Sequence, residues 1–422
     1  MKFSSLAERS IPLLLFVYPI LLLPLRGGVD WCFALLVLLS IYRLASVRTQ
    51  PAEKTWDRTA LIYLVSMLSL VLATFLSQTY HLQFNSHPYD GASRFLFAVP
   101  IYLMLRREPP ATLKTLQYGF PLGAIVSPFI LWFDPKNWGD NRLGSSFLNP
   151  IHFGDLALIL GFLSVLSIDW GRKDPWSVRS LKITGLIAGV SASLITGSRG
   201  GWLAIPALLI IWLYYRGRHN SAARNATIIL LALFAAASLY LFVPEVHRRI
   251  DSVFQNIAAY GHQNEDTSIG IRFQIWKAAV LLILKNPLFG LGPDQFKYMM
   301  MPLYHAGVIT RTAAEYGQGE VHSEILVHTV NLGIFGLVSI LLIYFGPLLL
   351  FIRSARSASH PGHAAAVMGI CLATGFIIFG LTVETFDLKM TATFYSLTVA
   401  VLLAAATNRR VPDDSGSGRN EA

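Results

Sequence analysis

The sequence has little charge and almost no cysteine. Of its 422 residues only 14% are charged, and the two cysteines are Cys32 and Cys371. A soluble domain usually carries about 25% charged residues, so the composition argues against an ordinary soluble protein. Each cysteine lies within an apolar run, so we expect no disulfide framework. Two cysteines alone also cannot form a zinc site.

Motifs of metal-dependent enzymes are absent as well. The chain has no His-Glu-x-x-His stretch, no phosphate-binding P-loop and no paired-cysteine motif. It also lacks Asp-x-Asp, the usual signature of enzymes that bind a metal ion and a nucleotide sugar. We therefore expect no metal ion and no other cofactor, and a sugar-nucleotide donor is disfavoured.

Long hydrophobic runs dominate what is present. Hydrophobic residues make up 54% of the chain and its mean hydropathy is +0.51. Runs of about 20 apolar residues match the thickness of a bilayer. The first run, Ile11 to Leu25, has no small-residue cleavage site after it, which indicates a span rather than a signal peptide. We predict twelve spans, at about residues 11–26, 29–46, 60–78, 92–105, 117–134, 151–169, 181–197, 201–216, 225–243, 323–352, 364–382 and 390–407.

The positions of Lys and Arg predict how these spans are oriented. With a cytoplasmic N-terminus, 21 of the 34 Lys and Arg residues fall in inner segments and six in short outer loops. The other seven lie in one long loop, to which the charge rule does not apply. The net charge of +10 thus reflects membrane topology, and we expect no nucleic-acid partner. Both termini are predicted to be cytoplasmic, with the long loop on the outer face.

This topology divides the chain into four parts. Residues 1–243 hold spans one to nine, residues 244–320 form the outer loop, residues 321–408 hold the last three spans, and residues 409–422 form a polar tail that we expect to be disordered. In the loop, apolar residues recur at helical spacing in two stretches, which predicts two amphipathic helices. These residues are Val246, Ile250, Val253 and Ile257, then Ile271, Ile275, Ala278 and Leu282.

Breaks follow the second loop helix. Asn286-Pro287 should end it, and the stretch Gly290-Leu291-Gly292-Pro293 should form a turn.

Three arginines lie on the predicted outer face, against the charge bias that orients the chain. Arg142 precedes span six, Arg199 sits in the tight hairpin between spans seven and eight, and Arg272 begins the second loop helix. A guanidinium stays protonated and its planar fork suits phosphate oxygens. Together the three predict a diphosphate clamp. The alternative is that each reaches lipid headgroups or pairs with a nearby acid.

His322 lies between Glu320 and Glu324, directly before span ten. Imidazole titrates near physiological pH, which makes His322 a candidate general base toward a sugar hydroxyl. The alternative is a polar residue at a helix start that faces water. His328 is six positions further on and is expected on a different face, which argues against a paired metal site.

Other polar residues lie near the outer ends of the spans. Asp155, Glu384 and Asp387 belong to the ends of spans six, eleven and twelve, and the simplest expectation is that each pairs with an outer arginine. His152 and Asn149 are weaker candidates.

Val321 to Leu337 reads V-H-S-E-I-L-V-H-T-V-N-L-G-I-F-G-L. It resembles the signature of the bacterial O-antigen ligase superfamily, in which a His is followed by Asn or Ser and by an apolar helix with Gly-x-x-Gly. Three further fragments match in the same order. They are Arg142 with the following Asn149-Pro150, the hairpin Thr196-Gly197-Ser198-Arg199-Gly200, and Arg272 leading into Asn286 to Gly292. The resemblance covers most of the chain.

The resemblance implies an all-α polytopic glycosyltransferase of the GT-C type that is metal-independent and inverting. Such an enzyme transfers a glycan from undecaprenyl diphosphate at the periplasmic face of the inner membrane. For a ligase, the O-antigen glycan goes to the lipid A–core of lipopolysaccharide; the superfamily's O-antigen polymerases and protein O-oligosaccharyltransferases share the donor. On this chain His322 would be the base, Arg199 and Arg272 would bind the diphosphate, and Arg142 would assist.

A ligase is the leading interpretation, because the modest chain has one outer loop and no large soluble C-terminal region. A transporter of lipid-linked glycans is the rival from another class. Such transporters usually show two related halves with a central loop. Here the long loop follows span nine and no half-repeat is apparent, so transfer is favoured over transport.

Overall fold

A computed structural model of the chain describes residues 2–46, 56–139, 142–170, 173–217, 222–261, 265–357 and 360–408. These residues are almost all helical, with one short antiparallel hairpin. The elements are α1 (Lys2–Leu21), α2 (Gly28–Ser46), α3 (Arg58–His81), α4 (Tyr89–Leu105), α5 (Pro110–Lys114), α6 (Leu116–Phe133), β1 (Lys136–Asn137), β2 (Leu143–Gly144), α7 (Pro150–Leu166), α8 (Trp176–Ile195), α9 (Arg199–Trp202), α10 (Ala204–Gly217), α11 (Ala222–Phe242), α12 (Pro244–Gly261), α13 (Ser268–Lys285), α14 (Phe296–His305), α15 (Arg311–Gly317), α16 (Glu324–Ser357), α17 (His360–Phe379) and α18 (Lys389–Ala406). The predicted disordered tail lies outside the described residues.

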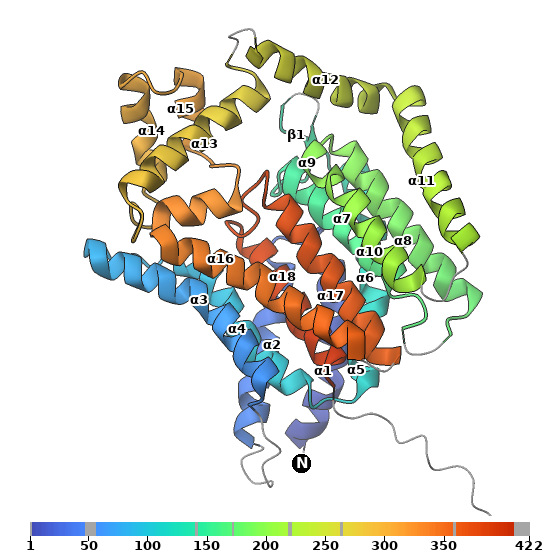
Figure 1. Cartoon of the computed structure of the whole chain (residues 1–422). Helices are drawn as coiled ribbons and strands as arrows, with labels where there is room; N and C mark the ends of the chain where they lie inside the picture. Colours follow the sequence, from blue (N-terminus) through green and yellow to red (C-terminus); the bar gives the residue numbers. More distant parts are fainter. Residues whose placement is uncertain are drawn as a thin grey trace, which may run out of the picture.

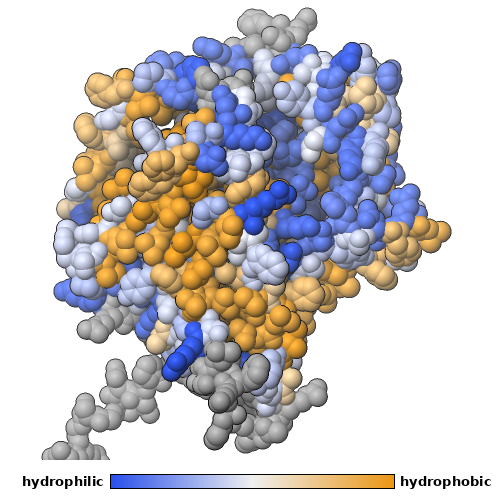
Figure 2. Space-filling view, turned by 180° about the vertical axis from the view of Figure 1, so that it is seen from behind, coloured by the Kyte–Doolittle hydropathy of each residue, from blue (hydrophilic) through white to orange (hydrophobic). Residues whose placement is uncertain are grey.

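Apolar helices account for the membrane region, because only helices or closed barrels satisfy backbone polar groups in lipid. Eight described helices are long and apolar enough to cross a membrane, and three shorter apolar helices lie within α1, α7 and α9–α10. Figure 2 shows hydrophobic residues across the middle and lower part of one face, with hydrophilic residues toward the upper end. The expectation of an all-α polytopic membrane protein is confirmed. Each predicted span overlaps a described helix, while the number twelve stays a prediction.

Two helices show the extremes of burial in the bundle. Every residue of α7 but Ile151 is buried, and the helix packs against α6, α8 and α17. A helix that is hydrophobic all round is expected in such a central place. Close approach of α8 requires Gly189, where a Cβ would lie 2.3 Å from the carbonyl oxygen of Ala157. In contrast, α11 has no buried residue among those described and stands at the edge of the molecule (Figure 1).

The outer loop contains the two predicted helices and two more. α12 and α13 coincide with the predicted amphipathic stretches, and α13 ends before Asn286 as expected. The sequence pattern did not predict α14 and α15. These two pack on α13 around a hydrophobic cluster of their own, separate from that of the bundle. In Figure 1, α12 crosses the top of the view between α11 and α13, with α14 and α15 beside α13.

α16 is broken at Gly333, which has φ +66°. The chain between α13 and α14 fills the break: Leu291 N–H donates to Val330 O (2.9 Å), and Ile334 N–H donates to Pro287 O (2.8 Å). A Cβ at Gly333 would lie 2.2 Å from the carbonyl oxygen of the residue after Pro287, so only glycine fits. The first turns of α16 are therefore bound to the outer loop.

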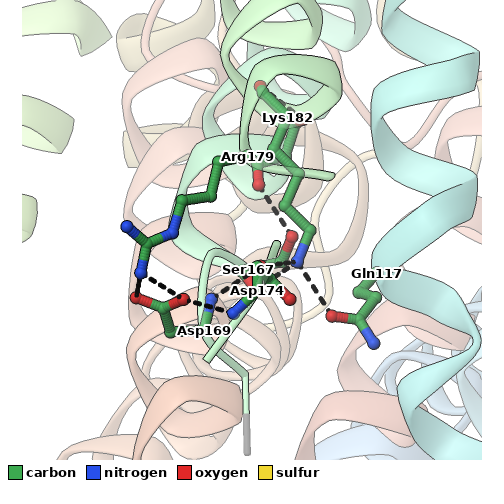
Figure 3. Close-up of polar contacts among 7 residues, drawn as sticks. Gln117, Ser167, Asp169, Asp174, Arg179 and Lys182 are labelled. Atoms are coloured by element: carbon green, nitrogen blue, oxygen red, sulfur yellow. Dashed lines mark hydrogen bonds and ion pairs between the residues drawn. The ribbon is translucent and has the colours of Figure 1, made fainter. Parts of the chain in front are cut away.

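A buried polar network connects the C-terminal end of α7 to the N-terminal part of α8 (Figure 3). Lys182 is fully buried, and its Nζ donates to Asp174 (2.7 Å), Gln117 (2.8 Å) and the Ser167 carbonyl (2.7 Å). The backbone N–H of Asp174 in turn donates to Asp169. The lysine charge is thus paired and hydrogen-bonded, as a buried charge requires.

Candidate functional site

The segment that precedes α16 and the loop between α17 and α18 are joined by reciprocal hydrogen bonds. Glu384 N–H donates to the Glu320 carboxylate (2.9 Å), and Val321 N–H donates to the Glu384 carboxylate. Glu324 N–H donates to the carbonyl of Gly380 (2.8 Å). We call these two joined segments the outer clamp. It fixes the backbone around His322 through a loop that is about 60 residues away in the sequence.

His322 adopts an uncommon backbone conformation within the outer clamp. Its φ is +59°, a left-handed conformation that few residues other than glycine adopt. The side chain is 16% exposed, and its Nδ1 lies 3.3 Å from a carboxylate oxygen of Glu320. The imidazole and the Glu320 carboxyl group thus lie side by side, with Nδ1 as the nearer ring nitrogen.

The Glu320 carboxyl responds to the same contact. Burial acts to raise its pKa, but the His322 imidazole and the backbone N–H of Glu384 outweigh burial. The pKa of Glu320 consequently lies below its usual range, and the group stays ionised beside the imidazole.

Arg272 lies on α13, one turn before a residue that contacts the outer clamp. That residue is Trp276, whose indole N–H donates to the carbonyl of Val321 (3.1 Å). Burial lowers the pKa of Arg272, the charge of Arg142 lowers it further, and Glu320 opposes both. No acid among the described residues forms an ion pair with Arg272. Arg272 is therefore a largely buried guanidinium with no ion-pair partner among the described residues.

The β1–β2 hairpin and the start of α7 position Arg142. Trp138 N–H donates to the Arg142 carbonyl, and Arg142 N–H donates to Gly139, each at 2.9 Å. Beyond the hairpin, the Asn149 side chain caps α7 by accepting from His152 N–H (3.0 Å). The structure therefore gives Asn149 a capping role. His152 is buried directly behind that cap.

Arg199 begins α9, after a turn in which Gly197 has φ +66°. The predicted tight hairpin is thus present. Nη1 of Arg199 donates to the carbonyl of Arg249 (3.0 Å) and to Ser252 Oγ (2.6 Å), both on α12. The charge of Arg142 affects the pKa of Arg272. The side chain of Arg199, in contrast, is attached to α12.

The expectation that three acids pair with outer arginines is wrong for the part of the chain that the structure describes. The Glu384 carboxylate faces a backbone N–H of the outer clamp, and Asp387 has no ion pair there. Asp155 is buried, and neither of its carboxyl oxygens has a hydrogen-bond partner. It backs onto α9, where a Cβ on Gly201 would lie 2.2 Å from one of those oxygens. Among the described residues, only Glu384 of the three accepts from a backbone N–H, and none of the three forms an ion pair with an arginine.

Burial and like charge explain the behaviour of Glu384. Burial, and then the negative charge of Glu320, raise the pKa of Glu384 well above its usual range. The Glu384 carboxyl group is therefore held closer to its neutral form than that of Glu320.

Sequence reasoning missed the position of Glu324. This side chain is fully buried and accepts from Thr385 Oγ1 and Phe386 N–H, each at 3.1 Å. Its other oxygen lies 2.7 Å from Nε2 of His328, one helical turn along α16. The i, i+4 spacing of Glu and His was the available signal.

Comparison with known proteins points to one family. Residues 184–341, which include Arg199, Arg272 and His322, match the family model described as O-Antigen ligase. A protein named O-antigen ligase in Escherichia coli (strain K12) is 19% identical over 292 residues, which is 67% of this chain and 68% of that protein. An uncharacterised protein of Haemophilus influenzae is 24% identical over 284 residues, 67% of this chain and 70% of that protein. The resemblance found in the sequence is thereby confirmed: residues 184–341 match the model of the O-antigen ligase family.

Proposed function

We propose that this protein is an O-antigen ligase. It would transfer an O-antigen glycan from undecaprenyl diphosphate to a sugar hydroxyl of lipid A–core, at the periplasmic face of the bacterial inner membrane. The family match and the apolar helices support this assignment. The proposal includes twelve spans, cytoplasmic termini, a GT-C-type architecture, contact with membrane lipids and an inverting reaction without a metal ion.

One observation carries the mechanism: the His322–Glu320 pair is held next to the α13 face that carries Arg272. Nε2 of His322 takes the proton of the acceptor hydroxyl. At the same time the hydroxyl oxygen attacks the anomeric carbon of the donor glycan. The bond from that carbon to the diphosphate oxygen breaks, and the electron pair leaves with the diphosphate. Ionised Glu320 then stabilises the imidazolium.

The arginines stabilise the leaving group in this mechanism. Arg272 and Arg142 place permanent positive charge where the diphosphate gains negative charge. Arg199 would bind the diphosphate from α9 while α12 holds one of its nitrogens. Because guanidinium groups remain charged at all working pH values, they can replace a divalent cation. Transfer is expected to persist in the presence of a chelator; loss of activity that Mg²⁺ restores would contradict the metal-free mechanism.

Replacing His322 with alanine tests the base directly. In purified, reconstituted protein, we expect transfer to fall by a factor of roughly 10²–10⁴. The matched control is Glu315→Gln, an exposed carboxylate on α15, which should transfer at the parent rate. Unimpaired transfer by His322→Ala would remove the histidine from the mechanism.

The choice of acceptor separates a ligase from its relatives. Donor should be offered alone, with lipid A–core, and with a candidate acceptor protein, and the products separated by size. Transfer that depends on lipid A–core supports the ligase. Chain growth in the donor-only reaction would assign a polymerase, and glycan on the protein would assign an O-oligosaccharyltransferase. Movement of intact donor across the bilayer without transfer would assign a transporter.

A further inference from the structure

A pocket opens at the outer end of the bundle, directly against the outer clamp. It is formed by α3, the α3–α4 connection with the start of α4, the turn before α14, the first turns of α16, and the α17–α18 loop with the first residue of α18. Its volume of about 120 Å³ gives room for on the order of ten water-sized groups, comparable to one sugar residue. Part of the wall is apolar, from Leu70, Val327, Leu332 and Phe386.

The pocket is acidic, and neither Arg142 nor Arg272 lines it. Its carboxyl groups are those of Asp90, Asp294, Glu324, Glu384 and Asp387. No arginine lines it. Lys389 is its only lysine, and the Lys389 ammonium lies 2.5 Å from Asp90. Such a wall repels phosphate and accepts hydrogen bonds from hydroxyl or ammonium groups.

Of the five carboxyl groups in this pocket, only that of Asp387 has no hydrogen bond or ion pair among the described residues. The oxygens of Glu324 are bound by His328 and by the loop before α18, and Asp294 lies 3.2 Å from His87. Asp387 is exposed, and among the described residues it has neither a hydrogen bond nor an ion pair. Its carboxyl group can therefore bind a ligand without losing an existing contact.

We propose that this pocket binds a hydroxyl-bearing saccharide without phosphate, and that it holds the accepting sugar of the transfer reaction. The proposal rests on the function proposed above. Glu324 and Glu384 belong both to the pocket wall and to the outer clamp that carries His322. A sugar in the pocket thus lies against the segment that bears the base, while the phosphate-binding arginines lie elsewhere. In this arrangement the acidic pocket takes the acceptor sugar, and the arginines take the diphosphate of the donor.

Saccharide binding to the full-length protein in detergent micelles tests the proposal. Saturation-transfer NMR should be recorded with methyl α-glucoside, with glucosamine and with glucose 6-phosphate. We expect the first two to bind and the phosphate to bind much more weakly. Stronger binding of glucosamine would show that the carboxylates select an ammonium group within the same saccharide class. Glucose 6-phosphate binding as tightly as methyl α-glucoside would overturn the proposal.

Two variants locate the binding in the pocket. Asp387→Asn removes the available charged acceptor, and we expect roughly tenfold weaker binding. His328→Gln changes a different wall residue and should also weaken binding, while Glu315→Gln on α15 should not. The thermal unfolding midpoint of each variant reports whether it is folded. Unchanged binding in folded Asp387→Asn and His328→Gln would overturn the proposal.

Arg272→Ala distinguishes this proposal from the proposed function. It should lose transfer yet bind methyl α-glucoside like the parent protein. If its saccharide binding falls as far as that of Asp387→Asn, the sugar occupies the arginine side and the pocket assignment is wrong. If no transfer is found in the parent while Asp387→Asn still loses binding, the pocket stands and the ligase assignment fails.

Discussion

The two ends of the helix bundle treat buried charge differently. Where α7 leads into α8, Lys182 has a carboxylate partner and two further acceptors, and Arg179 lies 2.9 Å from Asp169 beside it. At the end that carries the outer clamp, Arg272 is mostly buried without an ion pair, and Asp155 is buried with both oxygens unpaired among the described residues. The Lys182 ammonium is hydrogen-bonded within the protein, whereas Arg272 and Asp155 have no ion-pair partner among the described residues.

We interpret this difference as one between charges that hold the fold together and charges that are available to a ligand. A buried ion pair that is fully hydrogen-bonded holds a connection in place and offers little to a ligand. Unpaired charges cost folding free energy, and they concentrate at sites where a ligand completes them. We therefore expect substitution of Lys182 to change stability, substitution of Arg272 to change transfer, and substitution of the buried acids near the outer clamp to change stability by smaller amounts.

Lys182→Met should have the largest effect, and on stability. It leaves Asp174 as an uncompensated buried charge, which typically costs about 3–5 kcal/mol. Thermal unfolding in detergent measures this loss, and the double variant Lys182→Met with Asp174→Asn should recover part of it. Lys297→Met, an exposed substitution on α14, is the control. A midpoint for Lys182→Met equal to that of the control would contradict the structural role of the Lys182 network.

Arg272→Ala should show the opposite pattern. We expect transfer to fall by a factor of roughly 10²–10³, because one preorganised charge at the leaving group is lost. The unfolding midpoint should stay equal or rise, since an unpaired buried charge is removed. Arg272→Lys should restore only part of the rate, because an ammonium cannot form the planar fork. Arg311→Ala, exposed on α15, is the control, and a parent-like rate in Arg272→Ala would rule out the diphosphate role.

Glu384→Gln and Glu320→Gln should change the pH dependence of stability in opposite directions. The folded pKa of Glu384 is raised, so its stabilising contribution is present below about pH 4.3 and is lost as the pH rises through the folded value. Glu384→Gln removes that loss and should be more stable than the parent at neutral pH.

The folded pKa of Glu320 is lowered, so its contribution is present above about pH 4.3 and is lost as the pH falls through the folded value. Glu320→Gln should thus be less stable than the parent at neutral pH and equal to it in acid. Unfolding midpoints at several pH values check both variants. Parallel curves for the two would show that the outer clamp does not set these pKa values.

Asp155→Asn should have the smallest effect. The carboxyl group makes no hydrogen bond within the described residues, so the amide gives up no contact. We expect the free energy of unfolding to change by about 1 kcal/mol or less, toward greater stability. Thermal unfolding checks this, with Asp155→Ala as a companion that also removes volume. A large destabilisation by the amide would show that the carboxyl group has a structural partner.

Local pattern was enough to predict most of the fold. Membrane helices must satisfy their own backbone, so apolar runs located them, and helical spacing located α12 and α13. It did not locate α14 and α15, which are short helices stabilised by packing on α13. It also did not reveal the break at Gly333, because the hydrogen bonds that replace the helical ones come from about 40 residues away.

The candidate site was predicted less completely. Types of residue and the order of fragments identified His322 and three arginines, because their chemistry is intrinsic to the side chains. Partners were not predictable, since they come from distant segments. The reciprocal bonds of Glu320 and Glu384 and the attachment of Arg199 to α12 depend on how loops from different helices meet.

The break at Gly333 separates the segment that follows His322 from the long apolar remainder of α16. The residues from His322 to the break are hydrogen-bonded to the outer loop and to the α17–α18 loop, and the lipid-spanning remainder of α16 is a separate rod. The segment from His322 to Gly333 therefore takes its position from two loops, and the long apolar part of α16 beyond Gly333 does not set it directly.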